Sequence, residues 1–255
     1  MEVVNTRRIC QRFSAAAQTY SRHATAQQQI CVHLLNLLRQ QQRLSFSRVL
    51  EIGCGSGGFT RLLRTAGQVN EWCLNDLCES WSDELALHMA GEQWHWFGGD
   101  AEQLLFPGNF DLIVSANALQ WMQDLPAFLH RLSSSLRSQG LLLFNLFTPQ
   151  NLAEIRLLTG EGLHYPQPEE VIHWLERDYQ LLHHEEERIT LHFTDPMEVL
   201  RHLKYTGVTA NASGTWTKGK QMRFCEEYRN CFSTDDGQVT LTYTPVYLLA
   251  INNKQ

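Results

Sequence analysis

The chain of 255 residues carries a net charge of −6, and 43% of its residues are hydrophobic. This length and composition fit a globular chain with one large α/β domain and an insertion. No apolar run is long enough to span a bilayer, no signal-peptide core is present near the beginning, and the seven cysteines form no C-x-x-C pair. These features argue against membrane proteins and disulfide-rich secreted proteins, so we expect a cytoplasmic protein with free thiols.

Taken in chain order, the predicted elements begin with a largely helical segment over residues 3–43. Apolar runs then alternate with amphipathic helical patterns. Strands are predicted at 45–52, 71–77, 94–97, 110–115 and 140–147, and helices at 59–65, 82–90 and 125–136. Alternation of strands and helices at this short spacing is typical of a doubly wound parallel sheet.

The pattern changes after residue 148. Helices are predicted at 169–177, 195–205 and 218–232, with one strand-like run at 188–193 between them. Asp195 followed by Pro196 fits the start of a helix. A turn signal at 235–237 precedes a β-rich segment over 238–251. A large helical insertion therefore separates the parallel part of the predicted sheet from its last strands.

A glycine-rich loop over residues 49–57 is the strongest local signal. A buried strand ends at Ile52, and Gly53 and Gly55 then let the backbone turn and approach a ligand closely. The acidic Glu51 precedes the first glycine, where it disfavours a pyrophosphate and favours a cationic or zwitterionic ligand. This pattern resembles the first motif of S-adenosylmethionine-dependent methyltransferases of the Rossmann-like class.

The same loop also fits a second class of cofactor. Gly53, Gly55 and Gly58 satisfy the dinucleotide fingerprint G-x-G-x-x-G, and Asp76 lies near the distance of a ribose-binding acid. A dinucleotide-dependent oxidoreductase is thus an alternative. Glu51, Asp100 and the late β-rich segment favour S-adenosylmethionine instead.

The resemblance to methyltransferases implies roles for further residues. Asp76, at the end of the second strand, is predicted to accept hydrogen bonds from the ribose hydroxyls. Asp100, after the third strand, is predicted to bind the adenine amino group. The full set of predicted cofactor-binding residues is Glu51, Gly53, Cys54, Gly55, Asp76, Leu77, Asp100, Ala101, Glu102, Ser115 and Asn117.

Three further segments carry a more specific resemblance. Residues 117–121 (Asn-Ala-Leu-Gln-Trp), residues 13–20 with His23 and Gln27, and residues 202–208 resemble motifs of the malonyl-acyl-carrier-protein O-methyltransferases of biotin synthesis. Together with the glycine loop, these segments span nearly the whole chain. The resemblance implies a Rossmann-like seven-stranded methyltransferase sheet. The expected units are an N-terminal helical lid (1–44), a cofactor-binding core (45–148), a helical substrate and carrier-protein insertion (149–234) and closing antiparallel strands (235–255).

The implied reaction transfers a methyl group to the free carboxylate of a malonyl thioester. A carboxylate is ionised at neutral pH, so no general base is required and none is predicted. A metal is not expected either, because adjacent His183 and His184 point in different directions. The candidates for holding the substrate are Arg12, Tyr20, Trp121, Arg201, His202 and Lys204.

The distribution of charge suggests the form in which the substrate arrives. Residues 1–50 carry +6, residues 51–198 carry −15 and residues 199–255 carry +3. Basic segments at 7–22 and 201–223 could dock an acidic acyl carrier protein. The overall acidity disfavours nucleic acid, and we expect a monomer. A coenzyme A thioester, another small carboxylic acid, or a non-catalytic role in binding cofactor and carrier protein are the alternatives.

Overall fold

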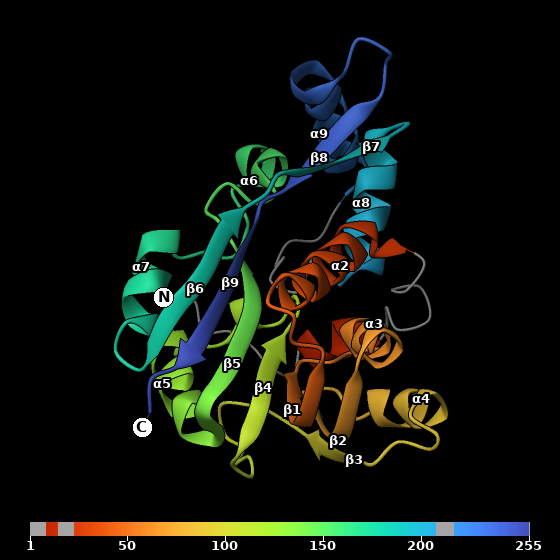
Figure 1. Ribbon diagram of the computed structural model, residues 1–255. Coiled ribbons are helices and arrows are strands. Elements are labelled where there is room, and N and C mark those ends of the chain that lie inside the picture. The colour runs from red at the N-terminus through yellow and green to blue at the C-terminus, as the bar shows by residue number, and fades with distance from the viewer. Residues whose placement is uncertain (1–8, 15–22, 208–216, 255) are drawn as a thin grey trace.

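The computed structural model describes residues 9–14, 23–207 and 217–254 (Figure 1). Its centre is a seven-stranded sheet in the order β3-β2-β1-β4-β5-β9-β6. The strands of this sheet are β1 (Ser45–Ile52), β2 (Gln68–Asp76), β3 (Trp94–Gly98), β4 (Phe110–Ser115), β5 (Leu136–Phe147), β6 (Tyr179–Glu186) and β9 (Pro245–Asn252). Strands β1 to β5 run parallel, whereas β9 is antiparallel to both β5 and β6. The predicted Rossmann-like sheet is confirmed.

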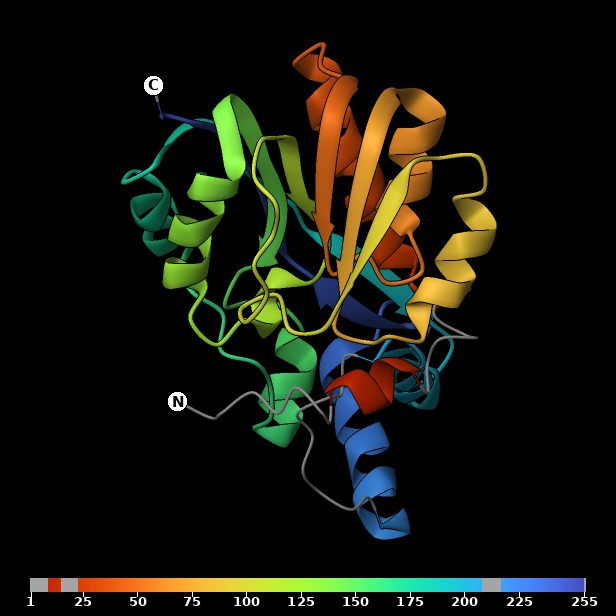
Figure 2. The same ribbon diagram turned by 90° about the horizontal axis from the view of Figure 1, so that it is seen from below.

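Helices cover both faces of this sheet (Figure 2). One face is covered by α2 (Thr25–Gln40), α3 (Gly58–Ala66) and α4 (Trp81–His88), and the other by α5 (Leu125–Ser135) and α7 (Pro168–Leu175). Consecutive residues of β1 point to opposite faces of the sheet. Val49 packs in the core beneath α2, α3 and α4, and Leu50 packs in the core beneath α5 and α7. Such burial on both faces explains the continuous apolar runs of the parallel strands.

A smaller unit extends from one end of the main sheet (Figure 1). It contains the antiparallel pair of β7 (Ile189–Phe193) and β8 (Val239–Tyr243), and the helices α6 (Ala153–Thr159), α8 (Pro196–Tyr205) and α9 (Lys218–Phe232). The short connections from β6 to β7 and from β8 to β9 join this unit to the main sheet. None of the helices in the described parts of the chain is long and apolar enough to cross a membrane.

Two details differ from the sequence-based expectation. Residues 179–186, predicted to lie within the helical insertion, form β6 at the edge of the main sheet. Strand β8, predicted to close the main sheet, pairs with β7 instead, so β9 alone of the last two strands joins the core. An edge strand has one hydrogen-bonded neighbour and exposes much of its surface. The polar sequence of β6 therefore gave no strand signal.

Candidate cofactor and substrate site

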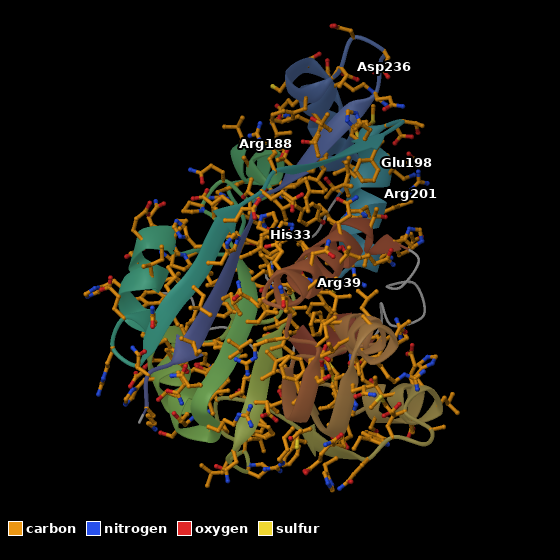
Figure 3. The ribbon with its side chains drawn as sticks, in the orientation of Figure 1. His33, Arg39, Arg188, Glu198, Arg201 and Asp236 are labelled. Atoms are coloured by element: carbon orange, nitrogen blue, oxygen red, sulfur yellow. The ribbon has the colours of Figure 1, made fainter. Side chains whose placement is uncertain are left out.

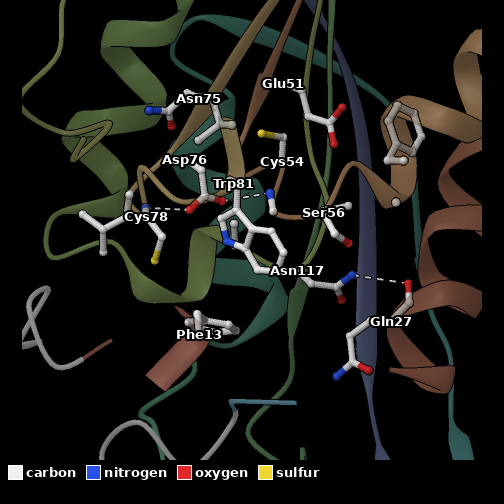
Figure 4. Close-up of a pocket in the computed structure, with 18 of the residues that line it drawn as sticks. Phe13, Gln27, Glu51, Cys54, Ser56, Asn75, Asp76, Cys78, Trp81 and Asn117 are labelled. Atoms are coloured by element: carbon white, nitrogen blue, oxygen red, sulfur yellow. Dashed lines mark hydrogen bonds between the residues drawn. The ribbon is translucent and has the colours of Figure 1, made fainter. Parts of the chain in front are cut away.

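A cavity of about 510 Å³ lies at the carboxyl edge of the parallel strands (Figure 4). The loops that follow β1, β2, β3 and β4 all contribute to its lining. This volume is within the range of pockets that bind small molecules, and the edge is where α/β sheets bind their ligands. Every residue predicted to bind the cofactor lines this cavity except Ser115. The buried Ser115 hydroxyl instead donates to the backbone oxygen of Ile52 at 2.9 Å and so ties β4 to β1.

The glycine loop after β1 is shaped by its backbone conformation. Gly53 has a φ of +67°, and a Cβ added to it would lie 2.2 Å from the Cβ of Ala118. Gly55 has a φ of +51°, but no atom lies within 4 Å of the position of its missing Cβ. Gly53 is thus required for packing against the loop after β4, while Gly55 leaves space open to the cavity.

Asp76, at the end of β2, holds the glycine loop in place. Its carboxylate accepts hydrogen bonds from the backbone N–H groups of Gly55 and Cys78, both at 2.8 Å. Burial raises the pKa of Asp76 to about 6. The neighbouring Asn75 donates to the backbone oxygens of Phe97 and Gly99 at 2.7 and 3.0 Å, which joins the loop after β3 to the same site.

Glu51 is buried in the wall of the cavity. Its carboxylate accepts a hydrogen bond of 2.6 Å from the hydroxyl of Thr60 on α3. Burial raises the pKa of Glu51 to about 8, and the nearby Asp76 acts in the same direction. A positively charged ligand group in the cavity would favour the ionised form of this carboxyl group.

Two acidic residues after β3 differ in what they contact. Asp100 lines the cavity and accepts a hydrogen bond of 3.0 Å from the backbone N–H of Glu102. Both carboxylate oxygens of Glu102 accept hydrogen bonds from the backbone N–H groups of Gln123 and Asp124, at 2.8 and 2.7 Å. The side chain of Glu102 therefore fastens the loop after β4 to the loop after β3.

Sequence reasoning missed several residues of the cavity. Trp81 at the start of α4, Met122, Arg61 and the thiols of Cys31 and Cys78 all contribute to its lining. Figure 4 places Trp81 beside Asp76, near the middle of the pocket. No local pattern distinguishes such a tryptophan from one in a hydrophobic core, because its role depends on how α4 packs against the sheet.

Comparison with known proteins decides the family. A family described as a methyltransferase domain matches residues 21–186. A malonyl-[acyl-carrier protein] O-methyltransferase of Porphyromonas gingivalis is 42% identical over 97% of this chain and 96% of its own length. One of Haemophilus influenzae is 38% identical over 97% of this chain and 95% of its own length. This chain belongs to the malonyl-[acyl-carrier protein] O-methyltransferase family.

A solved structure supports the same fold for this member of the family. The N-methyltransferase NodS from Bradyrhizobium japonicum, solved in complex with S-adenosyl-L-homocysteine, matches with a TM-score of 0.53. The match covers 88% of this chain and 86% of NodS, with 17% sequence identity. At this identity the likeness concerns the fold alone.

The substrate candidates of this methyltransferase fall into two groups. Trp121, in the short 3-10 helix η1 (Leu119–Trp121), lines the cavity and makes an edge-to-face contact with Phe13, at 5.8 Å between ring centroids. Arg12 is on the same helical segment as Phe13 (residues 9–14) and is half-buried, but it is not part of the cavity lining. Tyr20 lies outside the described residues.

The candidates on α8 of this methyltransferase do not line the cavity. Lys204 is exposed, and the exposed Arg201 forms an ion pair with Glu198 at 3.6 Å on the outer side of α8 (Figure 3). His202 is buried, and its Nε2 lies 2.8 Å from the hydroxyl oxygen of Tyr243 in β8. Burial lowers the pKa of His202 to about 4, so its ring is neutral at physiological pH and joins α8 to β8.

Proposed function

We propose that this chain methylates the free carboxylate of a malonyl group carried by acyl carrier protein, with S-adenosylmethionine as methyl donor, in biotin synthesis. The observation that carries the proposal is family membership over 97% of the chain. The cavity at the carboxyl edge of the sheet supports it, since loops from four parallel strands line a space of suitable size. The antiparallel β9 and the buried Glu51 argue against the dinucleotide alternative.

The residues of the cavity fit S-adenosylmethionine chemically. Glu51 offers a negative charge for a cationic methionine end, and Gly55 leaves space for close approach of the ligand. Asp76 and Asp100 offer carboxylate oxygens for the ribose and adenine, respectively. Leu77 and Ala101 provide apolar surface for the adenine ring.

The reaction needs alignment more than acid–base catalysis. When bound, the cofactor supplies a methyl carbon on a sulfonium, whose C–S bond breaks with both electrons moving to sulfur as a malonyl carboxylate oxygen takes the carbon. That carboxylate is already ionised, so no proton is transferred. The protein contributes by positioning the two reactants and by excluding water with rings such as those of Phe13 and Trp121.

Exposed cations support an acidic carrier protein as the form of the substrate. On α9, Lys218, Lys220 and Arg223 are all exposed, and α8 adds Arg201 and Lys204. An acyl carrier protein is acidic, so its attraction to these cations would raise the rate of encounter. Salt would weaken this attraction. A coenzyme A thioester would contact less of this surface.

A methyl-transfer assay tests the proposal. The purified protein is supplied with radiolabelled S-adenosylmethionine and with malonyl-acyl carrier protein, malonyl-coenzyme A or free malonate. We expect the highest kcat/KM with malonyl-acyl carrier protein. Transfer to none of the three, despite binding of S-adenosylhomocysteine in calorimetry, would overturn the assignment of substrate and leave the cofactor in place.

A further inference from the structure

A second, small cavity adjoins the cofactor cavity. Its volume is about 30 Å³, which suits a small polar group and not a whole acyl chain. Four residues line both cavities, namely Phe13, Gln27, Asn117 and Trp121. The remaining lining residues come from η1, from the end of β5 and the segment after it, from the residue after α8 and from β8. They are Gln120, Phe147, Asn151, Leu163, Tyr165, Thr206 and Tyr243. The described segments thus form a small pocket that shares part of its lining with the cofactor cavity.

Several buried polar atoms in this lining lack a partner. Within the described part of the chain, the indole Nε1 of Trp121 and the amide oxygens of Gln27 and Gln120 form no hydrogen bond. Gln27 is only 6% exposed, and Figure 4 shows it with Phe13 on the side of the pocket away from Glu51. Buried polar groups in proteins are normally hydrogen-bonded. Of these three atoms, the indole N–H is the donor, so it is the one that can bind an anionic ligand group.

The two tyrosines of the second cavity differ in their capacity to donate. The Tyr165 hydroxyl accepts a hydrogen bond from Asn151 at 3.0 Å, so its own proton remains to be donated. Burial raises the pKa of Tyr165 to about 12, which keeps that proton in place. The Tyr243 hydroxyl lies 2.8 Å from Nε2 of the neutral His202, so it already has a hydrogen-bond partner.

No charged side chain is among the described residues that line the second cavity. The guanidinium of Arg156 donates to the backbone oxygen of Asn151, at 2.7 Å, and Arg156 is itself outside the lining. Neutral donors suit a carboxylate nucleophile, because a direct ion pair with arginine would lower its nucleophilicity and repel the sulfonium. The sulfonium itself supplies the compensating positive charge for the buried carboxylate.

Resting on the proposed function, we infer that the second cavity holds the free malonyl carboxylate, with the indole N–H of Trp121 and the hydroxyl of Tyr165 as its neutral hydrogen-bond donors. Arg201 and Lys204 then serve the carrier protein and do not contact the carboxylate. Recognition by neutral donors leaves one carboxylate oxygen available to attack the methyl carbon.

The test uses Trp121→Phe and Tyr165→Phe, each of which removes one donor and keeps an aromatic ring. Because the indole N–H of Trp121 has no partner among the described residues, Trp121→Phe breaks no described hydrogen bond and should preserve the fold. A hydrogen bond to a charged group corresponds to roughly a 10-fold to 100-fold change in affinity. We expect each variant to lower kcat/KM for malonyl-acyl carrier protein by that factor through KM. Binding of S-adenosylhomocysteine should be unchanged in Tyr165→Phe, because Tyr165 does not line the cofactor cavity.

Matched variants control for the loss of the same chemical group elsewhere. Trp94→Phe changes a tryptophan at the amino end of β3, and Tyr179→Phe removes a buried hydroxyl that donates to Leu129. Both should retain wild-type kcat/KM. The affinities of the S-adenosylhomocysteine-bound protein for malonyl- and acetyl-acyl carrier protein provide a second readout. Variants of Trp121 and Tyr165 should lose the preference for malonyl over acetyl.

Retention of that preference in both variants would overturn the carboxylate site, and so would its loss in Arg201→Met or Lys204→Met alone. These outcomes are distinct from a failure of the proposed function. In that case the wild-type protein itself would transfer no methyl group to malonyl-acyl carrier protein, whatever the variants do.

Discussion

The carboxylate of Asp76 accepts a hydrogen bond from the backbone N–H of Gly55 at 2.8 Å, which joins the end of β2 to the glycine loop after β1. Asp76→Asn would replace one acceptor by an N–H₂ group that faces a backbone donor. We expect the affinity for S-adenosylhomocysteine to fall at least about 10-fold, measured by calorimetry. Asp111→Asn, at the opposite edge of the sheet, removes the charge that binds Arg137 and should leave this affinity unchanged. Equal effects of the two variants would contradict the prediction.

Binding of S-adenosylmethionine should depend on pH through Glu51. Burial raises the pKa of this carboxyl group to about 8, and a cationic ligand favours its ionised form. Below that pH, binding must release a proton, so we expect affinity to rise between about pH 6 and pH 8 and then to level off. Glu51→Gln should bind more weakly and with a smaller dependence on pH. Calorimetry in buffers of different ionisation enthalpy counts the released protons, and a count of zero at pH 7 would refute this account.

Stability of the ligand-free protein should change in the opposite direction. Buried Glu51 and Asp76 bind their protons more tightly in the folded chain than in the unfolded chain, because burial raises both pKa values. The free energy of unfolding should therefore fall as the pH rises from about 5 to 8. Urea unfolding at several pH values measures this fall. Glu51→Gln keeps an acceptor for Thr60 and should reduce the slope of the free energy of unfolding against pH. An unchanged slope in this variant would contradict the role given to Glu51.

Gly53→Ala should disrupt the site by two effects. Its φ of +67° is unfavourable for alanine, and the new Cβ would meet the Cβ of Ala118 at 2.2 Å. Gly91→Ala is the matched control, because Gly91 also has a positive φ, of +86°, but no atom lies within 4 Å of its missing Cβ. We expect both to cost about 1–3 kcal/mol in backbone strain. Gly53→Ala should cost more and should also abolish binding of S-adenosylhomocysteine, which Gly91→Ala should preserve.

The exposed cations of α9 should affect binding of the carrier protein and not the methyl-transfer step. Lys220→Glu combined with Arg223→Glu should raise the KM for malonyl-acyl carrier protein and make it less dependent on salt. Activity on malonyl-coenzyme A should change little. Lys254→Glu is the control, because it reverses the same kind of charge far from α9. The wild-type Lys254 lies near the end of the main sheet and donates to Ser134. A rise in KM that is the same for both thioesters would count against a docking surface on α9.

Much of the fold could be predicted because its signals are local. The buried strand at Phe110–Ser115 matches the predicted strand at both ends, since burial on both faces requires an uninterrupted apolar run. The helix start at Asp195 is confirmed by hydrogen bonds that its carboxylate accepts from the N–H groups of Met197 and Glu198, at 2.7 and 3.1 Å. Strand β6 could not be found this way, because its sequence is polar and largely exposed at the edge of the sheet.

The two cavities also differ in how far their residues could be found from local sequence signals. The cofactor cavity follows the ends of successive strands, so residues such as Gly53 and Asp76 could be found from their positions in the sequence. The second cavity combines distant segments, with Gln27 from α2, Tyr165 after β5 and Tyr243 from β8. No spacing in the sequence relates these residues. Only the packing of the smaller unit against the main sheet places them together.

The three thiols that line the cofactor cavity have a consequence for the protein itself. A thiolate is a stronger nucleophile than a carboxylate and would compete for an electrophilic methyl group. Burial, reinforced by the negative charge of Glu51, raises the pKa of Cys31 to about 12, and burial beside Asp76 raises that of Cys54 well above its usual value. Burial also raises the pKa of Cys78. Burial, reinforced by the acids that attract a cationic methyl donor, thus keeps the neighbouring sulfurs protonated. We expect this to protect the enzyme from methylating itself.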